Sequence, residues 1–313
     1  MSSWAGPDPS TVRVAGPWRH RGVSANGIQL HVAECGDGPL VMLAHGFGEF
    51  WWCWRHQLLG LADAGFRAVA VDLRGYGDSD KPPRGYDLWT LAGDLAGLVR
   101  ALGARDAAVV GHGWGGLIGW TLAALHPRLV RSLAVLGAPH PLALRRAVWT
   151  DPRGQGVAVA RTALEFQLPL LPERSLRADG AARVERLLRA RAGPEWPTTP
   201  EFAEVAARAR RAMLIPGVAH CALEYYRWAV RSQARPDGRR FASAVSRPVG
   251  APVLALHGAD DSVVLERTVR TSARWVAGPY RFTVLPRCGH FPHEEAAAAT
   301  TALLAKFLRE SVC

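Results

Sequence analysis

Two side chains that could do acid–base chemistry each follow an apolar segment with the pattern of a buried strand. Asp261 comes shortly after residues 252–257, and His290 comes shortly after residues 281–285. Ligands of helix-covered sheets bind at the carboxyl ends of the strands, so both residues are predicted to reach one site. A carboxylate that orients an imidazole leaves the second ring nitrogen free as a general base. A single Asp or His in a loop is more often a turn or surface residue, but together Asp261 and His290 predict catalysis.

Residues 107–110 have the pattern of a strand, and residues 117–125 have the pattern of a helix. The glycine-rich turn between them has the sequence context of a nucleophile elbow. Such an elbow presents the attacking residue at its middle position, between two glycines. Here that position, between Gly111 and Gly115, is Gly113. Glycine has no side chain, so the turn predicts a nucleophile position that holds no nucleophile.

The backbone N–H groups of Phe47 and Trp114 are candidates for an oxyanion hole, which needs no particular side chain. Phe47 lies in a loop after the apolar segment 40–44, and Trp114 follows the middle of the elbow. The elbow comes first in the chain, the acid second and the histidine last. This is the order in which hydrolases built on an α/β sheet carry their triads.

Short apolar strands that alternate with helices must position these residues. A hairpin is predicted over residues 23–34 around Asn26-Gly27. Further strands are predicted at 40–44, 67–73, 107–110, 132–136, 252–257 and 281–285, and helices at 54–64, 88–102, 117–125, 265–275 and 296–308. This alternation implies parallel pairing through crossover helices, so we expect an α/β fold with a mostly parallel, eight-stranded sheet.

The region 139–247 differs from the rest of the chain, because it is rich in Arg, Ala and Leu and is interrupted by prolines. It predicts an inserted helical cap. The expected domains are therefore a core of residues 1–138 and 248–313 and a cap of residues 139–247.

The composition is that of an ordinary globular protein: 313 residues, 49% hydrophobic and 21% charged. Lys81 and Lys306 are the only lysines, so the net charge of +11 comes from arginines. The arginines are scattered along the chain, which argues against a nucleic-acid-binding surface. No apolar run approaches the length of a membrane span, and residues 1–22 lack the apolar part of a signal peptide. We expect a cytoplasmic protein that binds no membrane. The five cysteines show no C-x-x-C spacing, and no metal or cofactor is expected.

These motifs resemble the epoxide hydrolase branch of the α/β-hydrolase family. The similarity is carried by residues 47–55, 74–82, 111–116 and 289–292, and it continues more weakly through 166–169 and 225–227. It covers residues 20 to 310, and haloalkane and haloacetate dehalogenases share most of its motifs. The resemblance implies that a carboxylate at the elbow opens an epoxide and forms an ester. Two cap tyrosines then protonate the leaving alkoxide, and the His–Asp pair activates water to hydrolyse the ester.

On this pattern the chain keeps His290, Asp261 and one tyrosine, Tyr226. It departs from the pattern at three positions. The nucleophilic aspartate is Gly113, the second tyrosine is Thr162, and the proline that ends an H-G-x-P motif is Gly48. The usual covalent route is therefore closed.

A glycine at the elbow relieves the strain of a positive φ and leaves a void about the size of an acetate. A water held there could be activated by His290 and Asp261 for direct attack on a small apolar epoxide, with Tyr226 donating to the leaving oxygen. The same pair could instead abstract a proton from an acidic substrate without a cofactor. The remaining alternative is a catalytically impaired or non-catalytic relative that binds an apolar ligand. We expect a hydrolase of the epoxide hydrolase type, and a homodimer is left open.

Other residues near the predicted site have less specific interpretations. Glu165 could substitute as an acid or nucleophile, but a glutamate on a helix surface is the better interpretation. His112 and His293 are interpreted as structural. Four tryptophans near the site predict either an aromatic lining or core packing: Trp51, Trp52, Trp54 and Trp114.

Overall fold

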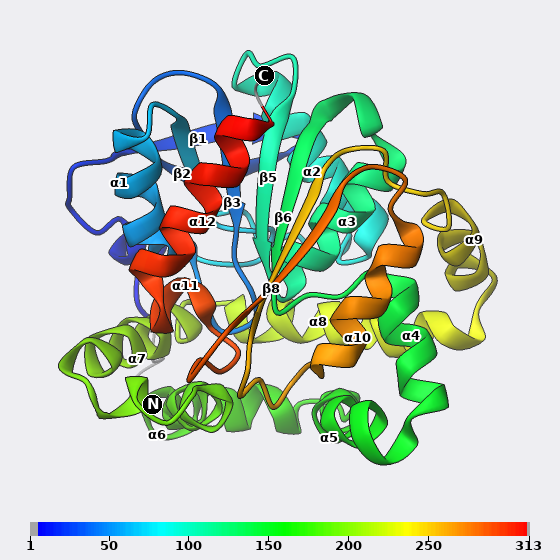
Figure 1. Ribbon diagram of the computed structural model, residues 1–313. Helices are drawn as coiled ribbons and strands as arrows, with labels where there is room; N and C mark the ends of the chain where they lie inside the picture. Colours follow the sequence, from blue (N-terminus) through cyan, green and yellow to red (C-terminus); the bar gives the residue numbers. More distant parts are fainter. Residues whose placement is uncertain (1–5, 312–313) are drawn as a thin grey trace.

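The computed structural model describes residues 6–311, without the side chains of residues 161 and 162. At its centre is one eight-stranded sheet with the order β1-β2-β4-β3-β5-β6-β7-β8. Its strands are β1 (Arg19–Ala25), β2 (Ile28–Cys35), β3 (Leu40–Ala44), β4 (Arg67–Val71), β5 (Ala107–His112), β6 (Val130–Leu136), β7 (Val253–Gly258) and β8 (Tyr280–Leu285). β2 pairs antiparallel with β1 and β4, and all other neighbours pair parallel. The predicted mostly parallel sheet is therefore confirmed (Figure 1).

The first two strands form the hairpin that the sequence predicts. Asn26 and Gly27 have φ angles of 49° and 79°, as a two-residue type I′ turn requires. Ala25 pairs with Ile28 directly across the turn. The turn chemistry therefore sets the register of this edge of the sheet.

Helices cover both faces of the sheet: α1 (Arg55–Asp63), α2 (Leu88–Ala101), α3 (Trp114–Leu125), α10 (Glu266–Arg270), α11 (Pro292–Glu295) and α12 (Ala297–Glu310). α1 packs on α12 and α2 packs on α3, and Figure 1 shows the two pairs on opposite sides of the strands. Strands β3, β5 and β7 are buried along their whole length, which explains why their sequences are apolar runs without alternation. The helix predicted over 265–275 is a short α10 followed by a 3-10 turn over Thr271–Trp275.

Between β6 and β7 the described chain forms helices and no strand. These are α4 (Pro141–Thr150), a π-helical turn (Pro152–Gly156), α5 (Val157–Glu165), α6 (Leu171–Arg191), α7 (Pro200–Met213), α8 (Val218–Arg231) and α9 (Pro236–Ala244). We call residues 139–247 the helical insertion, and its standing as a separate domain remains a prediction. Figure 1 shows most of its helices gathered along one end of the sheet.

The parallel strands bring three predicted site positions to one edge of the sheet. Gly113 follows β5, Asp261 follows β7 and His290 follows β8. None of the helices within residues 6–311 combines the length and apolar character needed to span a bilayer.

Candidate active site

The elbow lies where β5 ends and α3 begins. Gly113, the N-cap of α3, has φ of +50° and ψ of −113°. The backbones approach closely here, because a Cβ on Gly115 would lie 2.1 Å from the carbonyl oxygen of Ala44. Glycine is therefore required at position 115, and at position 113 the positive φ carries no penalty for glycine. The turn has the sharp strand-to-helix geometry of a nucleophile elbow, without a side chain at its middle position.

The first carbon of a side chain at position 113 would fit without displacing its neighbours. Apart from chain neighbours, the atoms nearest to a Cβ placed there are the Cα of Gly46 and the Nε2 of His290, both at 3.7 Å. These are ordinary van der Waals distances. We call the place that this side chain would take the Gly113 space, and the Nε2 of His290 lies 3.7 Å from the position of its Cβ.

His290 and Asp261 form a buried pair. The Nδ1 of His290 lies 2.9 Å from the Oδ2 of Asp261. The other carboxylate oxygen accepts hydrogen bonds from the backbone N–H groups of Val263 and Val264 at 2.7 and 3.0 Å. Burial alone would raise the pKa of Asp261, but the charge and hydrogen bond of His290, with the backbone donors, hold that pKa below its usual value. Asp261 is therefore ionised and fixes the orientation of the imidazole.

The second nitrogen of His290 is available for chemistry. When Nδ1 donates its proton to Asp261, Nε2 is an acceptor. Within the described part of the chain, Nε2 has no hydrogen-bond partner, and it faces the Gly113 space. His290 is only 6% exposed, so most of its imidazole is buried.

Tyr226 reaches the same region from α8 of the helical insertion. Its ring makes edge-to-face contacts with Phe47, Trp114 and Phe166, with ring centroids 5.1 to 5.2 Å apart. Among the described residues no hydrogen-bond partner binds its hydroxyl. The four rings form an apolar wall that carries one free hydroxyl group.

The two predicted oxyanion donors are unpaired in the described structure. Neither the N–H of Phe47 nor that of Trp114, the first residue of α3, has a backbone or side-chain acceptor within residues 6–311. The loop that carries Phe47 departs from the family pattern at Gly48, which has φ of +79°. Proline cannot adopt this angle, because its ring fixes φ near −65°. Glycine at position 48 thus permits a loop conformation that the usual proline excludes.

A second histidine–carboxylate cluster lies beside the pair, and sequence reasoning missed its central residue, Glu49. Glu49 binds the Nδ1 of His112 at 2.6 Å, the Nε2 of His293 at 2.9 Å and the backbone N–H of Gly46 at 2.6 Å. The Nε2 of His112 donates to the carbonyl oxygen of His290 at 2.8 Å. The signal in the sequence is an acidic residue directly before the aromatic run Phe50–Trp54.

The pKa values of the three residues of this cluster shift in different directions. Burial opposes charge on Glu49, but the two histidines hold its pKa well below the usual range. Burial also opposes charge on His112, yet Glu49 raises the His112 pKa above its usual value. Burial lowers the pKa of His293 to about 4. His112 and Glu49 therefore form an ion pair, and His293 is neutral.

Within residues 6–311, two groups of side chains have ligand atoms spaced closely enough to hold a metal ion. One is Glu49, His112 and His293, and the other is His56, Glu201 and Glu294. Each histidine already binds a carboxylate, and Glu294 binds the guanidinium of Arg55. We assign no ion to either group.

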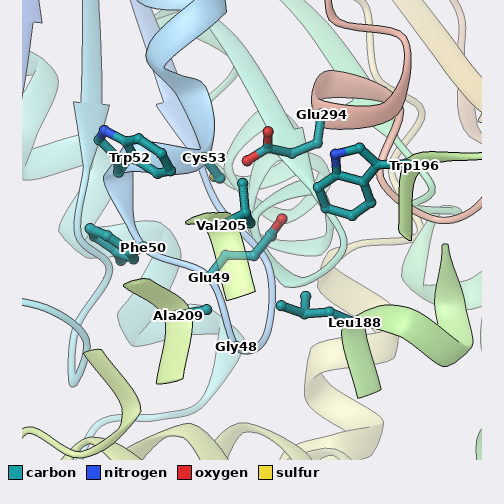
Figure 2. A pocket seen from close by; sticks show the side chains of 10 residues that line it. All are labelled: Gly48, Glu49, Phe50, Trp52, Cys53, Leu188, Trp196, Val205, Ala209 and Glu294. Carbon is teal, nitrogen blue, oxygen red and sulfur yellow. The ribbon is translucent and has the colours of Figure 1, made fainter. Parts of the chain in front are cut away.

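A cavity of about 10 Å³ lies between the loop after β3 and the helical insertion. Figure 2 shows Glu49 and Glu294 on its wall together with apolar side chains of the insertion. It is lined by Gly48, Glu49, Phe50, Trp52, Cys53, Leu188, Trp196, Val205, Ala209 and Glu294. This volume approaches that of one water and is too small for an organic substrate.

The remaining candidate residues lie elsewhere. Glu165 forms a partly exposed ion pair with Arg183, which agrees with its interpretation as a helix-surface residue. The side chain of Thr162 is outside the described part of the structure. Trp51 and Trp54 are fully buried in the core, so core packing explains them.

The chain is similar to known proteins over most of its length. Residues 39–297 match the alpha/beta hydrolase fold family. The chain is 30% identical to epoxide hydrolase A of Mycobacterium tuberculosis, over 91% of this chain and 96% of that protein. It is 32% identical to epoxide hydrolase 3 of Xenopus tropicalis, over 91% of this chain and 76% of that protein.

A solved structure gives the same result. The crystal structure of epoxide hydrolase A from Mycobacterium thermoresistibile superposes with a TM-score of 0.76 at 29% identity, over 93% of this chain and 98% of that one. The chain therefore belongs to the alpha/beta hydrolase fold family, and it is similar over most of its length to epoxide hydrolases.

Proposed function

We propose that the protein is a hydrolase that opens apolar epoxides with water activated by His290 and Asp261, without forming an ester on the protein. One observation supports this route above others: the Nε2 of His290 is unpaired among the described residues and lies 3.7 Å from the position that a Cβ on Gly113 would take. Similarity to epoxide hydrolases along nearly the whole chain supports the reaction class.

In this proposal the attacking water occupies the Gly113 space. The Nε2 of His290 takes a proton from the water while the water oxygen bonds to an epoxide carbon, and the C–O bond of the ring breaks. The hydroxyl of Tyr226 gives its proton to the alkoxide that leaves, so the product is a diol. Asp261 stabilises the imidazolium, whose proton returns to Tyr226 through solvent.

The surroundings favour an apolar substrate. The ring of Tyr226 contacts the rings of Phe47, Trp114 and Phe166, and in this proposal the epoxide lies against these rings. Aromatic rings bury apolar area efficiently and offer little to a charged or strongly hydrated group. We therefore propose an aryl or alkyl epoxide.

A single turnover with excess enzyme in H₂¹⁸O tests the route. Direct attack places one ¹⁸O atom in the diol of the first turnover and leaves the mass of the protein unchanged. An ester on the protein gives an unlabelled first diol and a heavier protein. A covalent adduct in the intact mass of the wild type would contradict the proposal.

Two variants complete this test. His290→Ala removes the base and is expected to abolish turnover on a panel of aryl and alkyl epoxides. Gly113→Asp restores a carboxylate at the elbow, so an ester adduct is expected in its intact mass. A folded Gly113→Asp variant with neither adduct nor turnover would contradict the alignment of the elbow.

The absence of a side chain at position 113 also favours a second candidate, because proton abstraction needs the His290–Asp261 pair but no nucleophile. A wild type that fails on every epoxide but exchanges an acidic C–H proton in D₂O would select it. Failure in both assays would identify a ligand-binding relative.

A further inference from the structure

We infer that the outer face of the helical insertion binds the surface of a bilayer that contains anionic phospholipid. This face is formed by residues 145–177, which comprise the C-terminal end of α4, the π-helical turn, α5 and the start of α6. We call it the insertion face. The contact does not depend on the route of epoxide opening at His290.

Exposed apolar side chains are concentrated on the insertion face. Within residues 6–311, seven large hydrophobic side chains are exposed, and six of them lie between positions 149 and 171. Their exposed fractions run from 48% to 74%. They are Trp149, Val157, Leu164, Leu168, Leu170 and Leu171. Exposed apolar residues that occur singly need no explanation, but this concentration indicates an interaction site.

The six side chains belong to one region of the fold. α4 and α5 both pack on the π-helical turn that joins them, and the three exposed leucines at 168–171 follow α5 directly in the chain. Figure 1 shows α5, the nearby end of α4 and α6 along the lower edge of the view. The insertion face is therefore on the outside of the molecule.

Leu170 is exposed in a backbone conformation that does not suit leucine. Its φ is +63°, in the left-handed region that bulky side chains avoid. It is the N-cap of α6 but makes no capping hydrogen bond through its side chain, and it is 63% exposed. Glycine would adopt this φ without strain. The local backbone therefore gives no reason for an apolar side chain at this position.

The charge around the apolar side chains is positive. Four exposed arginines of the insertion face have no carboxylate partner within residues 6–311: Arg145, Arg146, Arg153 and Arg174. The three acidic residues between positions 141 and 177 are already paired, Asp151 with Arg267, Glu165 with Arg183 and Glu173 with Arg227. The insertion face therefore offers cations and apolar groups together.

This combination favours a lipid surface over a second copy of the chain. Apolar side chains interleaved with arginines bind at the membrane interface, where anionic head groups attract the guanidinium groups. Two copies that met at this face would bring like charges together. The sequence prediction of no membrane binding depends on the lack of an apolar span, and a surface contact needs no span.

The insertion face is also connected to the candidate active site. The guanidinium of Arg227 donates to the carbonyl oxygens of Phe166 and Leu168, both at 3.1 Å. Arg227 follows Tyr226 on α8, and Phe166 belongs to the ring wall that Tyr226 contacts. For the apolar epoxides of the proposed function, binding to lipid would bring the site close to the phase in which they dissolve.

Co-sedimentation with lipid vesicles tests the inference. The whole chain is mixed at low salt with vesicles of phosphatidylcholine and phosphatidylglycerol in equal parts, and with vesicles of phosphatidylcholine alone. We expect the anionic vesicles to bind at least about tenfold more tightly, and added salt to weaken this binding. A wild type that does not bind the anionic vesicles overturns the inference.

Two arginine variants separate the insertion face from net charge. Arg145→Gln combined with Arg146→Gln is expected to weaken binding to anionic vesicles by at least about fivefold. Arg239→Gln combined with Arg240→Gln is the matched control, because both arginines are exposed on α9, which Figure 1 shows apart from α5. The control should change binding by less than about twofold. Equal weakening by the two pairs overturns the assignment of the surface.

Leu170→Gly tests the apolar part of the contact. It is expected to weaken vesicle binding by about threefold or more. Urea unfolding should show nearly unchanged stability, because relief of the positive φ offsets the greater freedom of glycine in the unfolded chain. Analytical ultracentrifugation tests the other occupant. Self-association of the wild type that Leu170→Gly abolishes, without vesicle binding, would assign the face to a second copy and overturn the inference.

Discussion

Two buried histidine–carboxylate pairs lie side by side at the carboxyl edge of the sheet. His290 binds Asp261 at 2.9 Å, and His112 binds Glu49 at 2.6 Å. The rings of the two histidines are 4.8 Å apart. Each pair joins an imidazole to a carboxylate through Nδ1, but the pairs differ in the partner of the second imidazole nitrogen, Nε2.

In His112 that nitrogen donates to the carbonyl oxygen of His290, whereas in His290 it has no partner within residues 6–311. A carbonyl oxygen can only accept, so the Nε2 of His112 carries a proton. With Nδ1 against an ionised Glu49, His112 is an imidazolium with no lone pair left for a base. The comparison teaches that the partner of the far nitrogen, and not the carboxylate, distinguishes a base from a positioning residue.

The largest expected effect is a loss of epoxide turnover, and it concerns the His290–Asp261 pair. Asp261→Asn removes the charge that orients His290 and stabilises its protonated form, so we expect epoxide turnover to fall by about 10²–10⁴-fold. Asp260→Asn is the control, because Asp260 is exposed and adjacent in sequence. The two variants are compared by kcat at constant pH. Equal activity of both variants would remove Asp261 from the mechanism.

The second effect is a loss of stability, and it concerns the His112–Glu49 pair. Glu49→Ala leaves the charge of His112 buried without a partner, which costs about 3–5 kcal/mol of unfolding free energy. Urea denaturation measures this loss. Glu165→Ala removes a partly exposed ion pair with Arg183 and should cost less than about 1 kcal/mol. Similar losses in the two variants would show that the Glu49 cluster is not ionic.

The third effect is a pH dependence of stability that His293 introduces into the Glu49 cluster. Burial lowers its pKa to about 4 in the folded protein, against 6.5 for the free side chain. The unfolded chain therefore binds a proton below pH 6.5 while the folded one does not, and stability falls as pH drops from 6.5 to 4, by up to roughly 3 kcal/mol.

His293→Gln keeps an amide donor for Glu49 but cannot titrate. Thermal unfolding from pH 7 to pH 4 should therefore show a shallower decline in the variant than in the wild type. Parallel profiles would assign the acid sensitivity to other groups.

The comparison also shows what the sequence could predict. Asp261, His290 and Gly113 were located from apolar segments and the turns after them, because the carboxyl ends of parallel strands share one edge of the sheet. The same local signals predict the hairpin at Asn26-Gly27. Each of these features depends on residues close together in the chain.

The Glu49 cluster depends on contacts between distant parts of the chain. Glu49 and His293 are 244 residues apart, and no local pattern pairs them. Likewise, nothing local separates Trp51 and Trp54, which pack in the core, from Trp114, which contacts Tyr226. The conformation of Gly48 could not be predicted from the loss of a proline alone, since glycine permits both signs of φ.

The smallest expected effect compares two adjacent tyrosines of α8. The hydroxyl of Tyr225 donates to the carbonyl oxygen of Arg74 at 2.8 Å and is fully buried, whereas that of Tyr226 has no partner among the described residues. Tyr226→Phe removes the proposed proton donor, and since solvent can supply a proton more slowly, we expect turnover to fall by about tenfold with little change in stability. Tyr225→Phe should instead lower the unfolding free energy by about 1 kcal/mol and leave turnover nearly unchanged. Parallel measurements of kcat and urea unfolding separate the two roles, and a larger loss of turnover in Tyr225→Phe would reverse the assignment of the proton donor.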